Sequence, residues 1–227
     1  MRRISRQSAS LLALAVGLLV LALSSRPASA LTLTGISNSS LAALTGAQVD
    51  TLTTAFDFAP AAAGGDGTVT SSVFEGVGDA EGLFLYVYQI DLFDAATSSV
   101  SAISGMAFDF TAPEAIAFGG GSLEAFTVTD DGGSVGPLLA SHTGTTARFF
   151  FIPEIGNDET SQQFGLFSAS LPGTAIATML DSGAGLVLEP TVLSNGVGAV
   201  PEPHAAVLFV VGWLTVAGFG RRRLRST

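Results

Sequence analysis

Hydrophobic and polar residues alternate over short segments between residues 31 and 199, and no long segment there has the spacing of an amphipathic helix. In the longest alternating segment, 83–92, aromatic and aliphatic residues share one face from Phe84 to Leu92. The other face is apolar at its start and polar at its end. We predict a central strand, with one face in the core and the other partly covered. Further candidate strands are 52–58, 68–74, 99–110, 123–129, 146–152, 162–168, 175–180 and 186–193.

Clusters of Gly and Asp lie between the candidate strands, for example Gly119-Gly120-Gly121 and Asp130-Asp131-Gly132-Gly133. These residue types favour tight turns. Many short strands joined by such turns predict an all-β fold, an antiparallel β-sandwich with jelly-roll-like connections. We expect few helices, and the segment 113–117 fits one helical turn in a loop.

The first 30 residues have the three parts of a secretory signal peptide. Arg2, Arg3 and Arg6 precede an apolar run over residues 11–23, and Ala28-Ser29-Ala30 supplies small residues for cleavage. We predict a signal helix that is removed by cleavage after Ala30. The apolar run is short for a stable membrane span, and an uncleaved membrane anchor is the alternative.

The C-terminal segment also has three parts in a fixed order. Val200-Pro201-Glu202-Pro203 comes first, and its prolines favour an extended backbone. An apolar run over residues 205–220 follows, which as a helix is just long enough to span a membrane. Four arginines then favour retention of the end in the cytoplasm. These arginines are Arg221, Arg222, Arg223 and Arg225.

This order of motif, apolar helix and arginine cluster resembles the PEP-CTERM sorting signal of exported bacterial proteins. The resemblance covers residues 200–225 and includes the signal peptide that this export route requires. It implies that an exosortase, a membrane-embedded transpeptidase, recognises the tail and cleaves at the motif. A simple tail anchor after a proline-containing linker is the alternative. Together with the strand pattern, the resemblance predicts three parts: a signal peptide (1–30), an exported β-sandwich (31–199) and a sorting signal (200–225).

The charge distribution excludes one class of partner. Eight of the nine basic residues lie in the terminal segments, and the ninth is Arg148. Residues 31–199 contain 18 of the 19 acidic residues, so this section carries about −17 (18 negative charges and one positive). Binding to nucleic acid requires several basic residues that displace counterions from phosphate. We therefore expect no nucleic-acid partner.

Residues suited to catalysis are scarce in the exported section. Ser-His-Asp catalysis needs a histidine base, and His142 is the one histidine there. Its Ser/Thr/Gly surroundings are typical of a solvated turn. A glycosidase would need a pair of carboxylates, and Tyr86 and Tyr88 are the aromatic residues left for sugar stacking. Arg148 is the one cation for an anionic ligand, and an ordinary strand residue is its simpler interpretation. We expect no enzymatic activity.

Calcium is the metal that the sequence favours, because Ca²⁺ prefers oxygen ligands. Asp130 with Asp131, or Asp91 with Asp94, would supply some of them. Neither pair matches an EF-hand loop, and aspartates in turns ordinarily serve the turn itself. The sequence contains no cysteine, which excludes thiolate metal sites and disulfides. We therefore expect no cofactor, with calcium as a weak alternative.

Two functions remain for the exported section. The first is a non-enzymatic surface or matrix protein, held briefly in the inner membrane by its tail and then delivered to the cell surface or exterior. The association of such tails with exopolysaccharide and biofilm production supports this function by resemblance. The second is a secreted protein that binds or cleaves carbohydrate through the face or the end loops of the sandwich.

Overall fold

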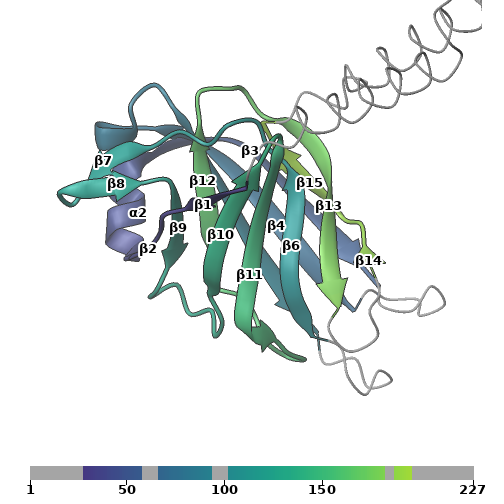
Figure 1. The fold of residues 1–227 in the computed structure, drawn as a ribbon. Coiled ribbons are helices and arrows are strands. Elements are labelled where there is room, and N and C mark those ends of the chain that lie inside the picture. The colour runs from purple at the N-terminus through teal and green to yellow at the C-terminus, as the bar shows by residue number, and fades with distance from the viewer. Residues whose placement is uncertain (1–27, 58–65, 94–101, 182–186, 196–227) are drawn as a thin grey trace, which may run out of the picture.

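The computed structural model describes residues 28–57, 66–93, 102–181 and 187–195, which form two stacked sheets (Figure 1). Sheet A has seven strands and sheet B has six. In spatial order, sheet A contains β1 (Ser29–Leu31), β10 (Pro137–Thr143), β11 (Thr146–Ile155), β6 (Ile103–Asp109), β13 (Gly173–Asp181) and β14 (Val187–Leu188), and β15 (Thr191–Ser194) also pairs with β13. Sheet B contains β2 (Leu33–Ile36), β9 (Ala125–Val128), β12 (Phe164–Ser168), β5 (Phe84–Leu92), β4 (Gly67–Gly76) and β3 (Thr45–Phe56).

The strand pairing is nested around the turn between β10 and β11. These two strands pair with each other, β9 pairs with β12, and β6 pairs with β13, all antiparallel. Successive pairs of this nest lie alternately in sheet A, sheet B and sheet A. The long hairpin formed by this part of the chain therefore wraps around the core. One pair departs from the antiparallel pattern, because β2 runs parallel to β9.

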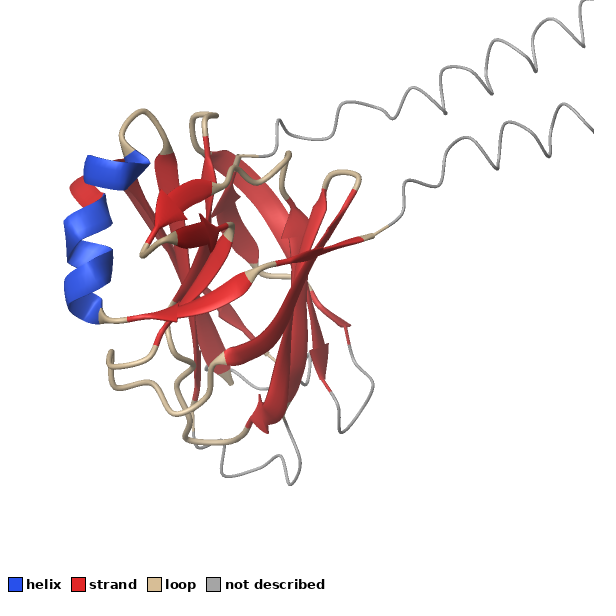
Figure 2. Ribbon diagram, turned by 60° about the vertical axis from the view of Figure 1, so that its left-hand side comes forward, coloured by secondary structure: helices blue, strands red, loops and turns tan. Residues whose placement is uncertain are grey.

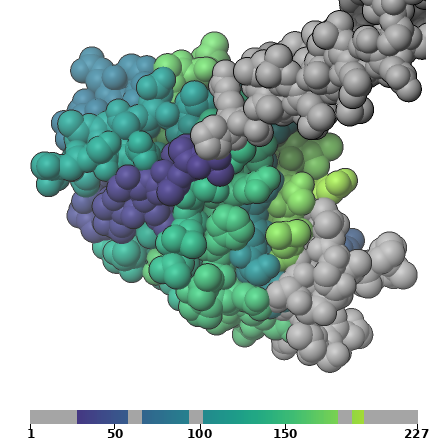
Figure 3. All heavy atoms as spheres, viewed as in Figure 1, coloured from purple at the N-terminus to yellow at the C-terminus, as the bar shows by residue number. Residues whose placement is uncertain are grey.

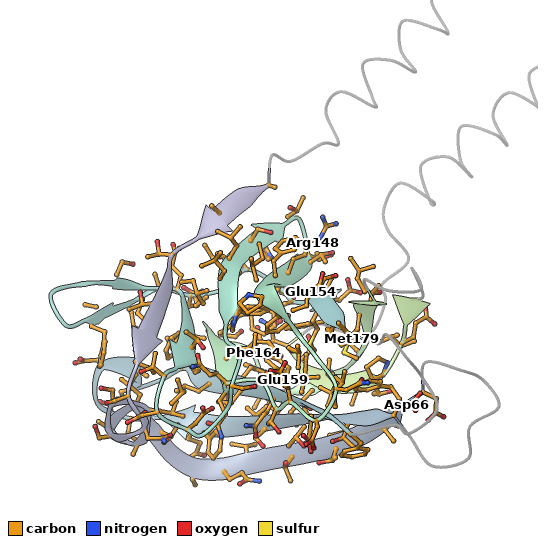
Figure 4. All side chains as sticks on the ribbon, turned by 90° about the horizontal axis from the view of Figure 1, so that it is seen from below. Asp66, Arg148, Glu154, Glu159, Phe164 and Met179 are labelled. Atoms are coloured by element: carbon orange, nitrogen blue, oxygen red, sulfur yellow. The ribbon has the colours of Figure 1, made fainter. Side chains whose placement is uncertain are left out.

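Aromatic side chains fill the space between the two sheets. Tyr86 and Tyr88 point from β5 into this core and are fully buried. The ring centroids of Tyr88 and Phe108 lie 4.6 Å apart, and those of Phe149 and Phe164 lie 4.7 Å apart. Phe164 lies between the layers in Figure 4. Tilted ring pairs across the layers thus stabilise the stacking of sheet A on sheet B.

A helix and a small hairpin cover the outer face of sheet B (Figure 2). The helix is α2 (Asn38–Leu44), and the hairpin consists of β7 (Ile116–Phe118) and β8 (Gly121–Leu123). A short 3-10 helix, η1 (Gly78–Ala80), belongs to the same cluster. Leu85 and Val87 of β5 are buried beneath this cover. Sheet B therefore has apolar packing on both faces.

Local sequence explains how these covering elements form. The Ser37 hydroxyl accepts a hydrogen bond from the Ser40 N–H, which caps the start of α2. Leu41 and Leu44, three residues apart, are buried on one side of this helix. The turn between β7 and β8 places Gly119 at φ 59° and Gly120 at φ 83°, which glycine adopts without strain.

The predicted all-β class is confirmed, since the described residues are mostly strand in antiparallel sheets with little helix. The prediction for segment 83–92 is also confirmed. The strand β5 lies inside sheet B, its first face is in the core, and its second face is covered by α2 and its neighbours.

Other local predictions were wrong. The proposed helical turn at 113–117 is instead a loop over residues 113–115 followed by the first two residues of β7. The single strand expected at 186–193 is divided into β14 and β15, and Pro190 lies between them. Five strands and the helix α2 were not predicted. The missed strands are β1, β2, β7, β8 and β10, and only Leu123 of β8 lies within a predicted strand.

Both predicted flanking helices, the signal helix and the membrane helix at 205–220, lie outside the described residues. Within the described part of the chain, we find no helix with the length and apolar character needed to cross a membrane.

Candidate functional site

The predicted sorting residues lie outside the described part of the chain. They are Val200, Pro201, Glu202 and Pro203 of the motif and Arg221, Arg222, Arg223 and Arg225 of the terminal cluster. The described domain ends at Asn195, so residues 196–199 are all that separate it from the motif. The structural features that bear on sorting are therefore those that fix this end of the domain.

The predicted signal cleavage site is partly described. Ala28 and Ala30 are both exposed. Ala30 lies in the middle of β1, where it is paired with Ser141 of β10. Cleavage after Ala30 would thus divide β1 and leave Leu31, paired with Ala140, as the first residue.

Side chains of sheet B hold β15 in place. The Thr54 hydroxyl donates to the carbonyl oxygen of Thr191 at 2.8 Å. The Leu193 N–H donates to the Ser71 hydroxyl at 2.9 Å, and the Leu193 carbonyl accepts from the Tyr88 hydroxyl at 2.8 Å. Since β15 pairs with β13 of sheet A, it joins the two sheets just before the domain ends.

Asn195, two residues after Leu193, is 3% exposed, and its side chain makes three hydrogen bonds. Its side-chain oxygen accepts from the Thr111 N–H at 2.7 Å. Its side-chain nitrogen donates to the Thr111 carbonyl at 2.7 Å and to the Ser168 hydroxyl at 2.5 Å. We call this set of three hydrogen bonds the Asn195 clamp. The clamp fixes the last residue that the structure describes before the motif.

His142 and Arg148 were considered for catalysis and for anion binding, and the structure places both on strands of sheet A. The His142 Nε2 lies 2.8 Å from the carbonyl oxygen of Phe110 and so carries the proton of that hydrogen bond. This is the nitrogen that a serine hydrolase would direct at its nucleophile. Arg148 is exposed on β11 between Ser141 and Ala107, and its side chain points away from the sandwich (Figure 4).

The aromatic pair considered for sugar stacking is in the core. Tyr86 and Tyr88 are each 0% exposed, in agreement with the predicted core face of segment 83–92, so neither is available for sugar stacking at the surface. Burial raises the pKa of both phenols, and the neighbouring Tyr86 raises the pKa of Tyr88 further. The Tyr86 hydroxyl donates to the Ser170 carbonyl at 2.9 Å. Both residues therefore stabilise the fold.

The aspartates considered for calcium accept hydrogen bonds from the protein. Asp130 Oδ1 accepts from the Asn38 N–H at 2.5 Å. Asp131 accepts from the Gly133 N–H with one oxygen and from the Gln163 N–H with the other. Asp91 accepts from the Thr160 hydroxyl at 2.6 Å, and Asp94 lies outside the described residues. Among the residues that are described, no three acidic or histidine side chains are grouped closely enough to hold a metal ion.

Sequence reasoning missed the Asn195 clamp. Thr111 lies 84 residues before Asn195, and Ser168 lies 27 residues before it. Ser194-Asn195-Gly196 has the composition of an exposed turn. Its burial depends on strands that are distant in sequence.

Comparison with known proteins provides no relative. No family model matches the chain, and no curated protein or solved structure is significantly similar to it.

Proposed function

We propose that this chain is an exported, non-enzymatic cell-surface or matrix protein whose C-terminal tail is a sorting signal for an exosortase. The observation that carries this proposal is the three-part tail over residues 200–225. A short apolar helix stopped by arginines would hold the chain in the inner membrane. The proline-flanked Glu202 would then lie extended at the outer surface, within reach of a membrane enzyme. The released protein joins the envelope or the extracellular polysaccharide.

The position of the Asn195 clamp supports this arrangement. Five backbone steps separate Asn195 from Val200, and an extended chain spans at most about 18 Å over that distance. The folded domain would therefore lie close to the membrane while the motif is processed. The clamp keeps the domain folded up to that point, so that the extended segment offered to the enzyme is short and begins at a fixed position.

The domain itself is proposed to serve as a stable exported module, residues 31–199, without a cofactor. The nested pairing around the β10–β11 turn supports a jelly-roll-like sandwich. Its charge of about −17 supports the absence of a nucleic-acid partner.

The sorting proposal is tested in the native host by the triple substitution Pro201→Ala, Glu202→Ala, Pro203→Ala. We expect a full-length form that stays in the membrane, identified by intact mass and cell fractionation. Pro172→Ala, in a loop of the domain, is the control and should leave processing intact. A triple variant with the mature mass and location of the wild type would rule out processing at this motif.

Carbohydrate binding or cleavage, through the sandwich face or its end loops, is the alternative function, and the buried Tyr86 and Tyr88 are not available to it for sugar stacking. A pull-down of the exported protein with the polysaccharide of its own host tests it, with release of reducing sugars measured in parallel. Saturable binding without release would identify a binding module. Release of sugars would contradict the non-enzymatic proposal.

A further inference from the structure

The outer face of sheet A differs from that of sheet B because no described element covers it and several large apolar side chains are exposed on it. Among the described residues, helix α2 and the β7–β8 hairpin lie on sheet B, and no element lies on this side of sheet A. Figure 3 views the same side, and the teal and green strands of sheet A reach the surface there. Nine large hydrophobic residues of the described chain are exposed, and five of them lie on β10, β11 and β13. These five are Leu138, Leu139, Ile152, Ile176 and Leu180.

The strand register places two of these residues, Leu139 and Leu180, in one row. Leu139 pairs with Phe150, Phe150 with Gly105, and Gly105 with Leu180. Leu139 is 56% exposed and Leu180 is 46% exposed. A Cβ atom at Gly105 would lie 3.6 Å from the Phe150 ring. The ring therefore lies beside the β6 backbone at a position that carries no side chain. The row is therefore a continuous apolar strip across four strands.

Two opposite charges lie beside this strip. Arg148 occupies the next outward position of β11, and Asp109 lies at the end of β6, two residues beyond the partner of Arg148. Both are exposed. In the paired rows from Leu139 to Asp109, the remaining outward residues are uncharged. We call this region, with Ile176, the open face.

We propose that the open face binds the open face of a second copy of the chain, in a two-fold dimer with reciprocal Arg148–Asp109 pairs. Two-fold symmetry makes the same patch meet itself, so a patch that carries one positive and one negative charge complements its own copy. The rest of the exported section has 17 acidic residues and no basic residue, so contacts elsewhere would bring carboxylates together. The apolar strip supplies hydrophobic surface that is removed from water on association. This proposal does not depend on the sorting proposal.

The test measures the oligomeric state of the protein purified in the form that its own cells export. Sedimentation equilibrium over a wide concentration range should give a monomer–dimer equilibrium. R148D and D109R should each weaken the dimer about tenfold or more, because each places like charges opposite one another. An equal mixture of the two variants should recover the wild-type affinity, because the mixed dimer restores both pairs. Their net charges of about −19 and −15 (−17 changed by two) keep both variants acidic, so general attraction cannot explain the recovery.

Control variants separate this face from general surface effects. L180D should abolish the dimer, whereas V49D, at a similarly exposed position on β3, should leave it unchanged. Circular dichroism melting checks that each variant is folded. A protein that is monomeric at every concentration would overturn the proposal, and so would a dimer insensitive to R148D and L180D. A monomer that binds its host's polysaccharide in an L180D-sensitive manner would assign the face to glycan instead.

Discussion

The Tyr88 hydroxyl donates a hydrogen bond of 2.8 Å to the carbonyl oxygen of Leu193, from the middle of one sheet to a strand of the other. Tyr88 is fully buried and Leu193 is 3% exposed, so water does not compete for this bond. The Leu193 N–H donates a second buried hydrogen bond, to the Ser71 hydroxyl. Besides its pairing with β13, β15 is thus held at Leu193 by side chains of sheet B, and the C-terminal end of the described domain depends on them.

Tyr88→Phe should lower the free energy of unfolding by about 1–2 kcal/mol, because it leaves the buried Leu193 carbonyl without its donor. Urea denaturation followed by circular dichroism measures the change. Tyr86→Phe is the matched control, since the Tyr86 hydroxyl bonds the carbonyl of Ser170, an exposed residue. Water can replace that bond, so a loss below about 1 kcal/mol is expected. Equal losses in the two variants would contradict the role assigned to burial.

Alkaline pH should unfold the protein through these same tyrosines. They are the only two tyrosines in the chain, which has no lysine or cysteine to titrate in that range. Their pKa values are raised in the folded state, so the folded protein keeps protons that the unfolded chain loses above pH of about 10. Stability is therefore complete below that pH and falls as the pH rises, by about 1.4 kcal/mol per pH unit for each tyrosine.

This pH dependence is followed by urea denaturation between pH 8 and pH 11, with tyrosinate absorbance recorded in parallel. Tyrosinate should appear only as the protein unfolds. The double variant Tyr86→Phe, Tyr88→Phe should lose the decline above pH 10, although it starts from a lower stability. Formation of tyrosinate near pH 10 in a protein that is still folded would show that the two phenols are accessible.

The Asn195 clamp makes a separate prediction. Asn195→Ala removes three hydrogen bonds at a buried position, so the free energy of unfolding should fall by about 2–3 kcal/mol. Asn195→Asp keeps the acceptor for the Thr111 N–H but has no donor for the Thr111 carbonyl, and it should cost at least as much. Asn38→Ala is the control, because the Asn38 side chain also bonds a backbone carbonyl but is exposed. A loss below about 1 kcal/mol is expected there. Faster hydrogen exchange in β15 of the Asn195 variants would locate the effect.

The sequence was sufficient to predict the parts of the fold that depend on alternation. Both faces of β5 follow from its residues, because each inward residue from Phe84 to Leu92 is apolar. The strand β10 was missed because its register shifts between Pro137 and Leu139, which interrupts the alternation. In α2, the cap and the spacing of the two leucines are visible in the sequence, but seven residues are too few to distinguish a helix from a loop.

Site prediction failed where a residue's role depends on distant partners. Asn195 is an example, because its burial depends on Thr111 and Ser168, which are distant from it in sequence. The open face has a similar origin. Leu139, Phe150 and Leu180 become neighbours through strand register, and nothing in their local sequences indicates that they share a surface.

The single tryptophan offers a direct measure of tail removal. Trp213 is the only tryptophan in the chain, and it lies within the apolar run after the motif. Cleavage at residues 200–203 would therefore produce an exported protein without tryptophan. Excitation at a wavelength that tyrosine does not absorb should give emission from the membrane-held precursor and none from the released protein. Leu171→Trp is the control, because Leu171 is 72% exposed on the domain and its replacement should keep emission after release. Tryptophan emission from released wild-type protein, with an intact mass that includes the four terminal arginines, would show that the protein is released without cleavage of its tail.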